Sequence, residues 1–160
     1  MAAGKSYFSQ EAAKKYNLSA FDIDDFTESK AGISINEIFK ISGEPAFRKL
    51  EHQAFSEILK KARLSKTHFI IAAGGGLLTY EPNIALLEGL TPIFIDTPFD
   101  IIKERLKAGR EQRPLAPDEE NELKKHWQTR RKNYIKYSKY IVACEKDFYN
   151  LIESLIGVTK

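Results

Sequence analysis

Short apolar runs alternate along the chain with longer segments of helical period. The runs occupy residues 20–23, 69–72, 92–95 and 140–143. Short, nearly continuous apolar runs are typical of strands that are buried on both faces of a sheet. The alternation of such strands with helical segments predicts an α/β protein, in which helices cover both faces of a central parallel sheet.

Helical segments are expected between these strands. One begins at Ser34, whose hydroxyl can cap the helix while Glu37 reaches back to the cap. A second, over residues 44–61, places an apolar stripe toward the sheet. Two more are expected over residues 99–107 and 118–134. Between those two, residues 108–117 contain Gly, Pro and Arg with little to bury, which predicts a mobile loop.

Composition narrows the class of protein. The chain has 160 residues, 42% of them apolar, which suits one compact domain over residues 1–160. The net charge is +3 without a basic block, which mildly favours an anionic ligand and gives no sign of nucleic-acid binding. The single cysteine, Cys144, excludes an internal disulfide. A single cysteine suits a reducing compartment, so we expect a cytoplasmic protein. No apolar stretch is long enough for a membrane span, and we expect a monomer that binds neither nucleic acid nor membrane.

The first candidate for chemistry is the tripeptide Gly4-Lys5-Ser6, which precedes a stretch with helical spacing of apolar residues. Alone it is a weak signal. A complete phosphate-binding loop has a further Gly four residues before Gly4 and a strand before that, so that backbone N–H groups curl around the phosphates at a helix N-terminus. Only residues 1–3 precede Gly4 here.

Two carboxylates, Asp22 and Asp24, come at the end of the first predicted strand. Alternation along a strand places both on one face, at the edge of the sheet where open α/β proteins bind ligands. Two carboxylates beside a phosphate site suit Mg²⁺ and a substrate hydroxyl. The alternative is a helix cap with a surface charge, a role that suits Asp25 better than its neighbours.

Three glycines and two arginines complete the candidate site. Gly74, Gly75 and Gly76 end the second predicted strand, where they permit backbone to approach a ligand closely or simply form a flexible turn. Arg48 and Arg130 lie on predicted helices. A single arginine is more often a solvated surface residue, but an arginine fork can bind both oxygens of a substrate carboxylate.

Together these residues resemble the shikimate kinase family, over most of the chain. The stretches that carry the resemblance are Gly4-Lys5-Ser6, Phe21-Asp22-Ile23-Asp24, residues 32–39, residues 43–51, Gly74-Gly75-Gly76, Arg113-Pro114-Leu115, and Arg130 four residues before Tyr134. Their order and spacing match the family pattern. The resemblance implies a three-layer P-loop kinase fold with a five-stranded parallel sheet, four strands of which are visible here, and a mobile lid near residues 108–117.

The resemblance also implies an activity, the Mg²⁺- and ATP-dependent phosphorylation of the 3-hydroxyl of shikimate in chorismate and aromatic amino acid biosynthesis. On the nucleotide side, Gly4 and Lys5 would bind the ATP phosphates. Ser6 would ligate Mg²⁺ directly, and Asp22 would reach the ion through water. Arg113, in the lid, would close over ATP and stabilise charge on the transferred group.

On the acceptor side, the resemblance implies that Asp24 holds shikimate hydroxyls and helps to orient or deprotonate the attacking one. Arg48 and Arg130 would clamp the carboxylate, and the glycine turn would offer the Gly75 N–H. Lys132-Asn133-Tyr134 stands where the family usually has Pro-Leu-Tyr. This departure leaves open whether Arg130 or the adjacent Arg131 is the clamp.

The family's first strand is central in the sheet and feeds the phosphate loop, whereas here only residues 1–3 precede Gly4. We therefore expect the chain to begin partway through its loop, with Met1 as an internal methionine. Two alternatives to a shikimate kinase remain at this point. One is a gluconate kinase-like enzyme of the same fold, and the other is a kinase relative that has lost catalysis and acts as a binding or regulatory protein.

Overall fold

The computed structural model describes residues 2–65, 67–108 and 120–157. Two compact units can be distinguished within the chain. The first unit is Gly4–Leu86, and the second is Leu87–Lys160 together with Met1–Ala3. The expectation of one domain over residues 1–160 stays a prediction.

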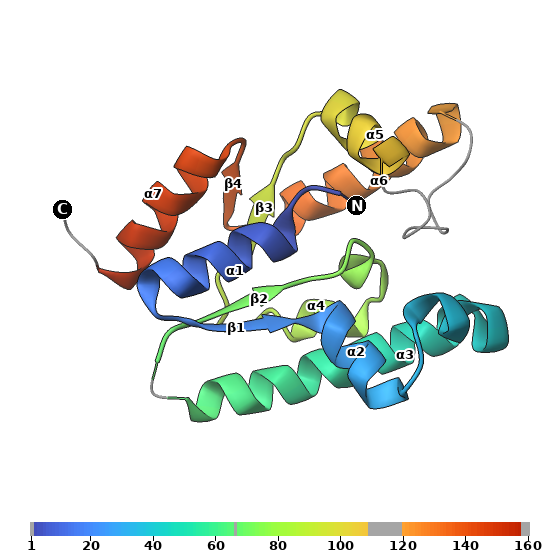
Figure 1. Cartoon of the computed structure of the whole chain (residues 1–160), viewed down its shortest axis with the longest axis horizontal. Helices are drawn as coiled ribbons and strands as arrows, with labels where there is room; N and C mark the ends of the chain where they lie inside the picture. Colours follow the sequence, from blue (N-terminus) through green and yellow to red (C-terminus); the bar gives the residue numbers. More distant parts are fainter. Residues whose placement is uncertain (1, 66, 109–119, 158–160) are drawn as a thin grey trace. The chain divides into compact units, whose positions relative to one another are not determined.

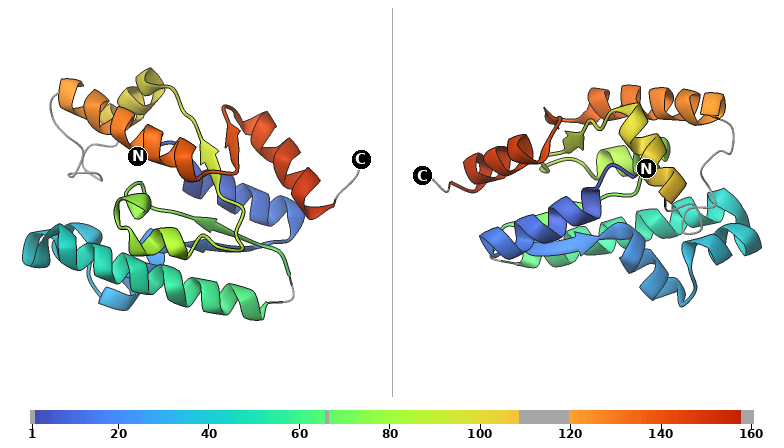
Figure 2. Two further views of the ribbon diagram at one scale, coloured as in Figure 1. Left: turned by 180° about the vertical axis from the view of Figure 1, so that it is seen from behind. Right: turned by 45° about the horizontal axis from the view of Figure 1, so that its top comes forward.

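The first unit is built on two parallel strands with helices on either side (Figure 1). Its elements are α1 (Lys5–Tyr16), β1 (Ser19–Asp22), α2 (Ile23–Ala31), α3 (Ile35–Leu64), β2 (Phe69–Ala72), the 3₁₀ turn η1 (Leu77–Thr79) and α4 (Pro82–Ala85). The strands pair in parallel from Ser19 opposite Phe69 to Asp22 opposite Ala72. Helices α1 and α3 lie on opposite sides of this pair (Figures 1 and 2). Both predicted strands are therefore confirmed as parallel strands.

The first strand ends one residue earlier than expected, at Asp22, because a helix begins at Ile23. Asp22 is the N-cap of α2, and its Oδ1 accepts a hydrogen bond from the Asp24 N–H at 2.9 Å. This cap satisfies one of the free donors at the helix start, and it turns the chain out of the sheet. The prediction that Asp24 lies on the strand, on the same face as Asp22, was wrong. The capping role considered for Asp25 belongs to Asp22.

Helix α3 carries most of the core of this unit. It opens with the expected capping box, in which Ser34 and Glu37 exchange hydrogen bonds. The helix is interrupted at Gly43, whose φ of 74° and ψ of 176° are not helical. A glycine tolerates this conformation, and Pro45 two residues later suits the start of a new helical segment. Four positions of the predicted stripe, Phe47, Ala54, Ile58 and Leu59, are buried, whereas its fifth member, Leu50, is only half-buried.

The second unit contains the other two predicted strands. Its elements are β3 (Ile93–Ile95), α5 (Phe99–Ala108), α6 (Glu120–Tyr137), β4 (Tyr140–Val142) and α7 (Glu145–Ile156). Strands β3 and β4 are parallel, with Ile93 opposite Tyr140. Among the described residues, β1 and β2 form one two-stranded sheet and β3 and β4 another. Apart from Ala108, which ends α5, the expected lid lies outside the described residues.

Helices α5 and α6 of the second unit share a small core formed by Ile102, Leu106 and Leu123. Phe99 and Trp127 pack against it, with their ring centroids 5.7 Å apart.

In the described part of the chain, no helix is both long enough and apolar enough to cross a membrane.

Candidate active site

The Gly-Lys-Ser tripeptide lies at the start of α1, as its position in the sequence predicts. Gly4 is the N-cap, with a φ of 88° in the left-handed region that favours glycine. Lys5 and Ser6 lie in the first turn, where the described residues include no acidic side chain. The first N–H groups of a helix have no partner within the helix, and the helix dipole adds positive charge there. This end of α1 can therefore receive a phosphate group.

Ser6 and Asp22 meet beside that helix end. The Ser6 hydroxyl donates to Asp22 Oδ2 at 2.6 Å. A hydroxyl and one carboxylate suit Mg²⁺ bound to a nucleotide, because the ion keeps several waters and takes phosphate oxygens as its other ligands. The described residues contain no cluster of three or more His, Cys, Asp or Glu that could hold a metal by itself. The donor set thus fits a magnesium ion that arrives with a nucleotide.

Asp24 is the second residue of α2, partly buried and close to the glycine turn. Burial raises the pKa of its carboxyl, and the neighbouring charge of Asp22 raises it further. The positive charges of Lys5 and Arg48 act in the opposite direction, but they do not cancel the rise. A carboxylate with a raised pKa is a stronger base than an exposed one. Asp24 is therefore suited to orient a hydroxyl group or to accept its proton.

Gly74 and Gly76 lie where site side chains come very close to the backbone. A Cβ on Gly74 would meet Asp24 Oδ1 at 2.7 Å and Glu51 Oε1 at 2.8 Å. A Cβ on Gly76 would meet Arg48 Nη2 at 2.2 Å. These distances are shorter than real Cβ contacts, so a side chain at Gly74 would displace the Asp24 or Glu51 carboxylate, and one at Gly76 would displace the Arg48 guanidinium. The glycines thus leave room for the Asp24, Glu51 and Arg48 side chains, and the prediction that they let the backbone approach a ligand stays a prediction.

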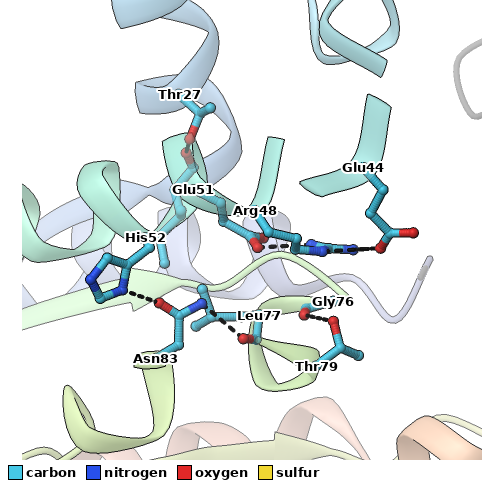
Figure 3. A network of polar contacts seen from close by, with 10 residues as sticks. Thr27, Glu44, Arg48, Glu51, His52, Gly76, Leu77, Thr79 and Asn83 are labelled. Atoms are coloured by element: carbon cyan, nitrogen blue, oxygen red, sulfur yellow. Dashed lines mark hydrogen bonds and ion pairs between the residues drawn. The ribbon is translucent and has the colours of Figure 1, made fainter. Parts of the chain in front are cut away.

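Arg48 is buried on α3 and held between two glutamates (Figure 3). Its Nη1 donates to Glu51 Oε2 at 2.7 Å, and its Nε and Nη2 donate to Glu44 Oε1 at 3.1 and 2.8 Å. Burial lowers the pKa of the guanidinium, but Glu51 and Glu44 outweigh that effect, and the pKa is raised. Arg48 is therefore a permanent, oriented positive charge next to the glycine turn.

Glu51 is a site residue that sequence reasoning missed. Only 1% of it is exposed, and it lies three residues after Arg48, on the same face of α3. A signal was present in the sequence. Glu51 falls within the apolar stripe, four residues after Phe47 and three before Ala54, where a charge is out of place unless it is paired. Arg48 at the i−3 position is the partner that this pattern could have indicated.

The remaining predicted residues belong to the second unit. Arg130 lies on α6, and Arg113 lies outside the described residues. The adjacent Arg131 binds Asp96 through two parallel hydrogen bonds, Nε to Oδ1 at 2.8 Å and Nη2 to Oδ2 at 2.7 Å. A guanidinium held in this way already has a carboxylate partner. The choice between Arg130 and Arg131 as the clamp for a substrate carboxylate stays open.

Comparison with known proteins identifies the family of this chain. The family model described as shikimate kinase matches residues 1–156. The chain belongs to the shikimate kinase family. It is 34% identical to the shikimate kinase of Aquifex aeolicus, over 85% of this chain and 78% of that protein, and 32% identical to that of Flavobacterium psychrophilum, over 97% and 92%. The resemblance read from the sequence is confirmed.

Solved structures agree with this assignment. A crystal structure of shikimate kinase from Aquifex aeolicus has a TM-score of 0.79 at 30% identity, and covers 98% of this chain and 92% of that one. A shikimate kinase from Acinetobacter baumannii, in complex with shikimate, has a TM-score of 0.84 at 22% identity, with 98% and 89% covered. The α/β fold of the P-loop shikimate kinases, predicted from the motifs, is therefore confirmed.

Proposed function

We propose that this chain transfers the γ-phosphoryl group of ATP to the 3-hydroxyl of shikimate. The observation that carries the proposal lies in the first unit. At the N-terminus of α1, Lys5 and Ser6 form the part of the site that binds the nucleotide, here called the nucleotide end. Asp24, next to the buried guanidinium of Arg48, forms the part that binds the phosphate acceptor, here called the acceptor end. The positive charges of Lys5, from the nucleotide end, and of Arg48, from the acceptor end, both act to lower the pKa of Asp24, so the two ends lie close enough to influence the same carboxyl.

On the nucleotide side, the N–H groups at Gly4 and the Lys5 ammonium bind the phosphates. Ser6 and Asp22 hold Mg²⁺, which neutralises phosphate charge when it is bound. Arg113 closes over the nucleotide from the lid and stabilises charge on the transferred group. Phosphoryl transfer depends mainly on positioning and electrostatics, so these groups are sufficient in kind.

On the acceptor side, Asp24 accepts hydrogen bonds from shikimate hydroxyls, and it orients or deprotonates the attacking one. Arg48 binds the carboxylate and Arg130 completes the clamp, while the Gly75 N–H gives a further hydrogen bond. The glycine turn contributes no side chain that would fill the space at Arg48. A compact acid with hydroxyl groups fits this set of partners.

The direct test is ADP release by the chain with Mg-ATP, measured without acceptor, with shikimate and with gluconate. We expect release that depends on shikimate and is near background with gluconate. Calorimetric titration with shikimate should show binding in the absence of ATP. Binding of shikimate without turnover would instead identify a binding protein on a kinase scaffold, and preference for gluconate would contradict the proposed acceptor.

Gly76→Ala should raise the KM for shikimate by about tenfold or more, because the new methyl group displaces the Arg48 guanidinium. The φ of Gly76, −117°, is open to alanine, so no backbone strain is added. Steady-state kinetics with shikimate as the varied substrate measure the effect. Denaturant unfolding in an Arg48→Met background gives the control: there the same substitution should cost little stability, and equal losses of stability in the two backgrounds would contradict a clash with the guanidinium.

Glu44→Gln should lower the KM for shikimate by about two- to fivefold. Glu44 holds two donors of Arg48, and its side chain is 59% exposed, so it competes weakly with a substrate carboxylate for the guanidinium. The matched control is Glu57→Gln on the same helix, whose partner is Lys30. An unchanged or higher KM for the Glu44 variant would show that Glu44 helps to hold Arg48 ready rather than competing for it.

A further inference from the structure

Asn83, at the start of α4, is completely buried and makes two side-chain hydrogen bonds. Its Nδ2 donates to the Leu77 carbonyl at 2.9 Å, and its Oδ1 lies 2.8 Å from His52 Nδ1 (Figure 3). The Leu77 carbonyl can only accept, which fixes the orientation of the amide. The Asn83 oxygen therefore faces His52, and His52 must donate from Nδ1. One buried side chain thus ties η1 to α3.

The two elements joined by Asn83 both contribute to the acceptor end of the site, beside Asp24 on α2. Helix α3 carries Arg48 and Glu51, and His52 comes one turn after Arg48. Leu77 directly follows Gly76, the residue whose Cβ position lies 2.2 Å from the Arg48 guanidinium. With so little space, a small shift of the turn relative to α3 changes what can approach Arg48.

Two further hydrogen bonds hold the preceding carbonyl of the same turn, that of Gly76. The hydroxyl of Thr79 donates to the Gly76 carbonyl at 2.6 Å, and the Thr79 backbone N–H donates to the same oxygen at 2.9 Å. The carbonyls of Gly76 and Leu77 are thus both held, one from within the turn and one by Asn83. Of these contacts, only the one made by Asn83 reaches across to α3, through His52.

We propose that Asn83 is a positioning residue for the acceptor, which sets the spacing between the glycine turn and Arg48 through its bonds to Leu77 and His52. This inference rests on the proposed function, and it deepens the description of the shikimate site. Asn83 does not act on the nucleotide end, where Lys5, Ser6 and Asp22 belong to α1 and the end of β1. Its loss should therefore affect acceptor binding more than ATP binding.

The test is Asn83→Asp, which keeps the size of the side chain and the acceptor for His52 but places an oxygen against the Leu77 carbonyl. We expect the KM and the calorimetric Kd for shikimate to rise by about tenfold, while the KM for ATP changes by less than about twofold. Asn150→Asp on α7 is the matched control, because Asn150 is exposed. It should behave as the wild type in both measurements.

A second pair of variants addresses the other bond. His52→Leu removes the donor to Asn83 and should weaken shikimate binding by about threefold, whereas His52→Gln retains an N–H donor and should restore most of the affinity. Ile58→Val, at a buried position on α3 remote from these bonds in sequence, separates loss of stability from loss of position. It should lower the melting temperature without changing the KM for shikimate.

The outcomes distinguish the inference from the function on which it rests. Wild-type protein that binds no shikimate would overturn both. Wild-type protein that binds shikimate, beside a folded Asn83→Asp variant that binds it equally tightly, would overturn the positioning role alone. Equal increases in the KM for ATP and for shikimate would also overturn it, because a general loosening of the fold does not select one substrate.

Discussion

Asp24→Asn is expected to lower kcat for shikimate phosphorylation by about a hundredfold or more, while it makes the protein more stable at neutral pH. The amide keeps the shape of the side chain but can neither accept a proton nor hold the attacking hydroxyl as strongly. In the wild-type protein, burial and the neighbouring charge of Asp22 both raise the pKa of Asp24, so the ionised carboxyl is disfavoured in the folded state. The neutral amide removes this cost, and stability rises. The site therefore keeps a charge that the fold alone disfavours.

The pH dependence of this stability difference follows from the direction of the pKa shift. The pKa of Asp24 is higher in the folded protein than the ordinary value of about 3.9, so the wild-type protein loses stability as the pH rises from that value through the folded pKa. The asparagine variant has no such loss. Melting temperatures should therefore coincide near or below pH 4, and they should separate in favour of the variant at higher pH.

The control for this pair of measurements is Asp25→Asn, a change of the same kind at the neighbouring, exposed position. It should leave kcat close to that of the wild type. A value of kcat for Asp24→Asn within about threefold of the wild type would limit Asp24 to binding the acceptor. Equal melting temperatures at every pH would contradict the raised pKa.

Much of the fold could be predicted from local sequence patterns, because the forces that produce it act over short distances. Apolar runs locate the four strands to within a residue or so, and Ser34 with Glu37 locates the start of α3. The error at the end of β1 has the same local origin. The run of residues 20–23 favours a strand, but the hydrogen bond from the Asp24 N–H to Asp22 starts a helix at Ile23.

The contacts that complete the acceptor end could not be predicted in the same way. Glu51 was visible as a charge within an apolar stripe, and spacing alone could have paired it with Arg48. His52 and Asn83 carry no such signal, because they are 31 residues apart and their bond depends on how α3 and α4 pack. The closeness of Gly76 to the Arg48 guanidinium is likewise a product of packing. Sequence supplied the residue types, and tertiary structure supplies their distances.

The second large effect is expected at Arg48. Arg48→Met should destabilise the protein by about 3–5 kcal/mol and remove measurable shikimate binding, because it leaves the buried carboxylate of Glu51 without its cation. Denaturant unfolding measures the first loss, and calorimetric titration measures the second. In the double variant Arg48→Met/Glu51→Gln, which removes the orphaned charge but keeps the shape of the side chain, most of the stability should return.

Binding should not return with it, since the amide offers no cation to the substrate carboxylate. Arg131→Met is the matched control. Its partner Asp96 is less deeply buried than Glu51 and the Arg131 side chain is 40% exposed, so we expect a much smaller loss of stability than for Arg48→Met and no change in shikimate affinity. A large loss of affinity in the control would show that Arg131, rather than Arg130, binds the substrate carboxylate together with Arg48. Recovery of binding in the double variant would contradict a direct role of Arg48, and would mean that this arginine serves the fold by neutralising Glu51.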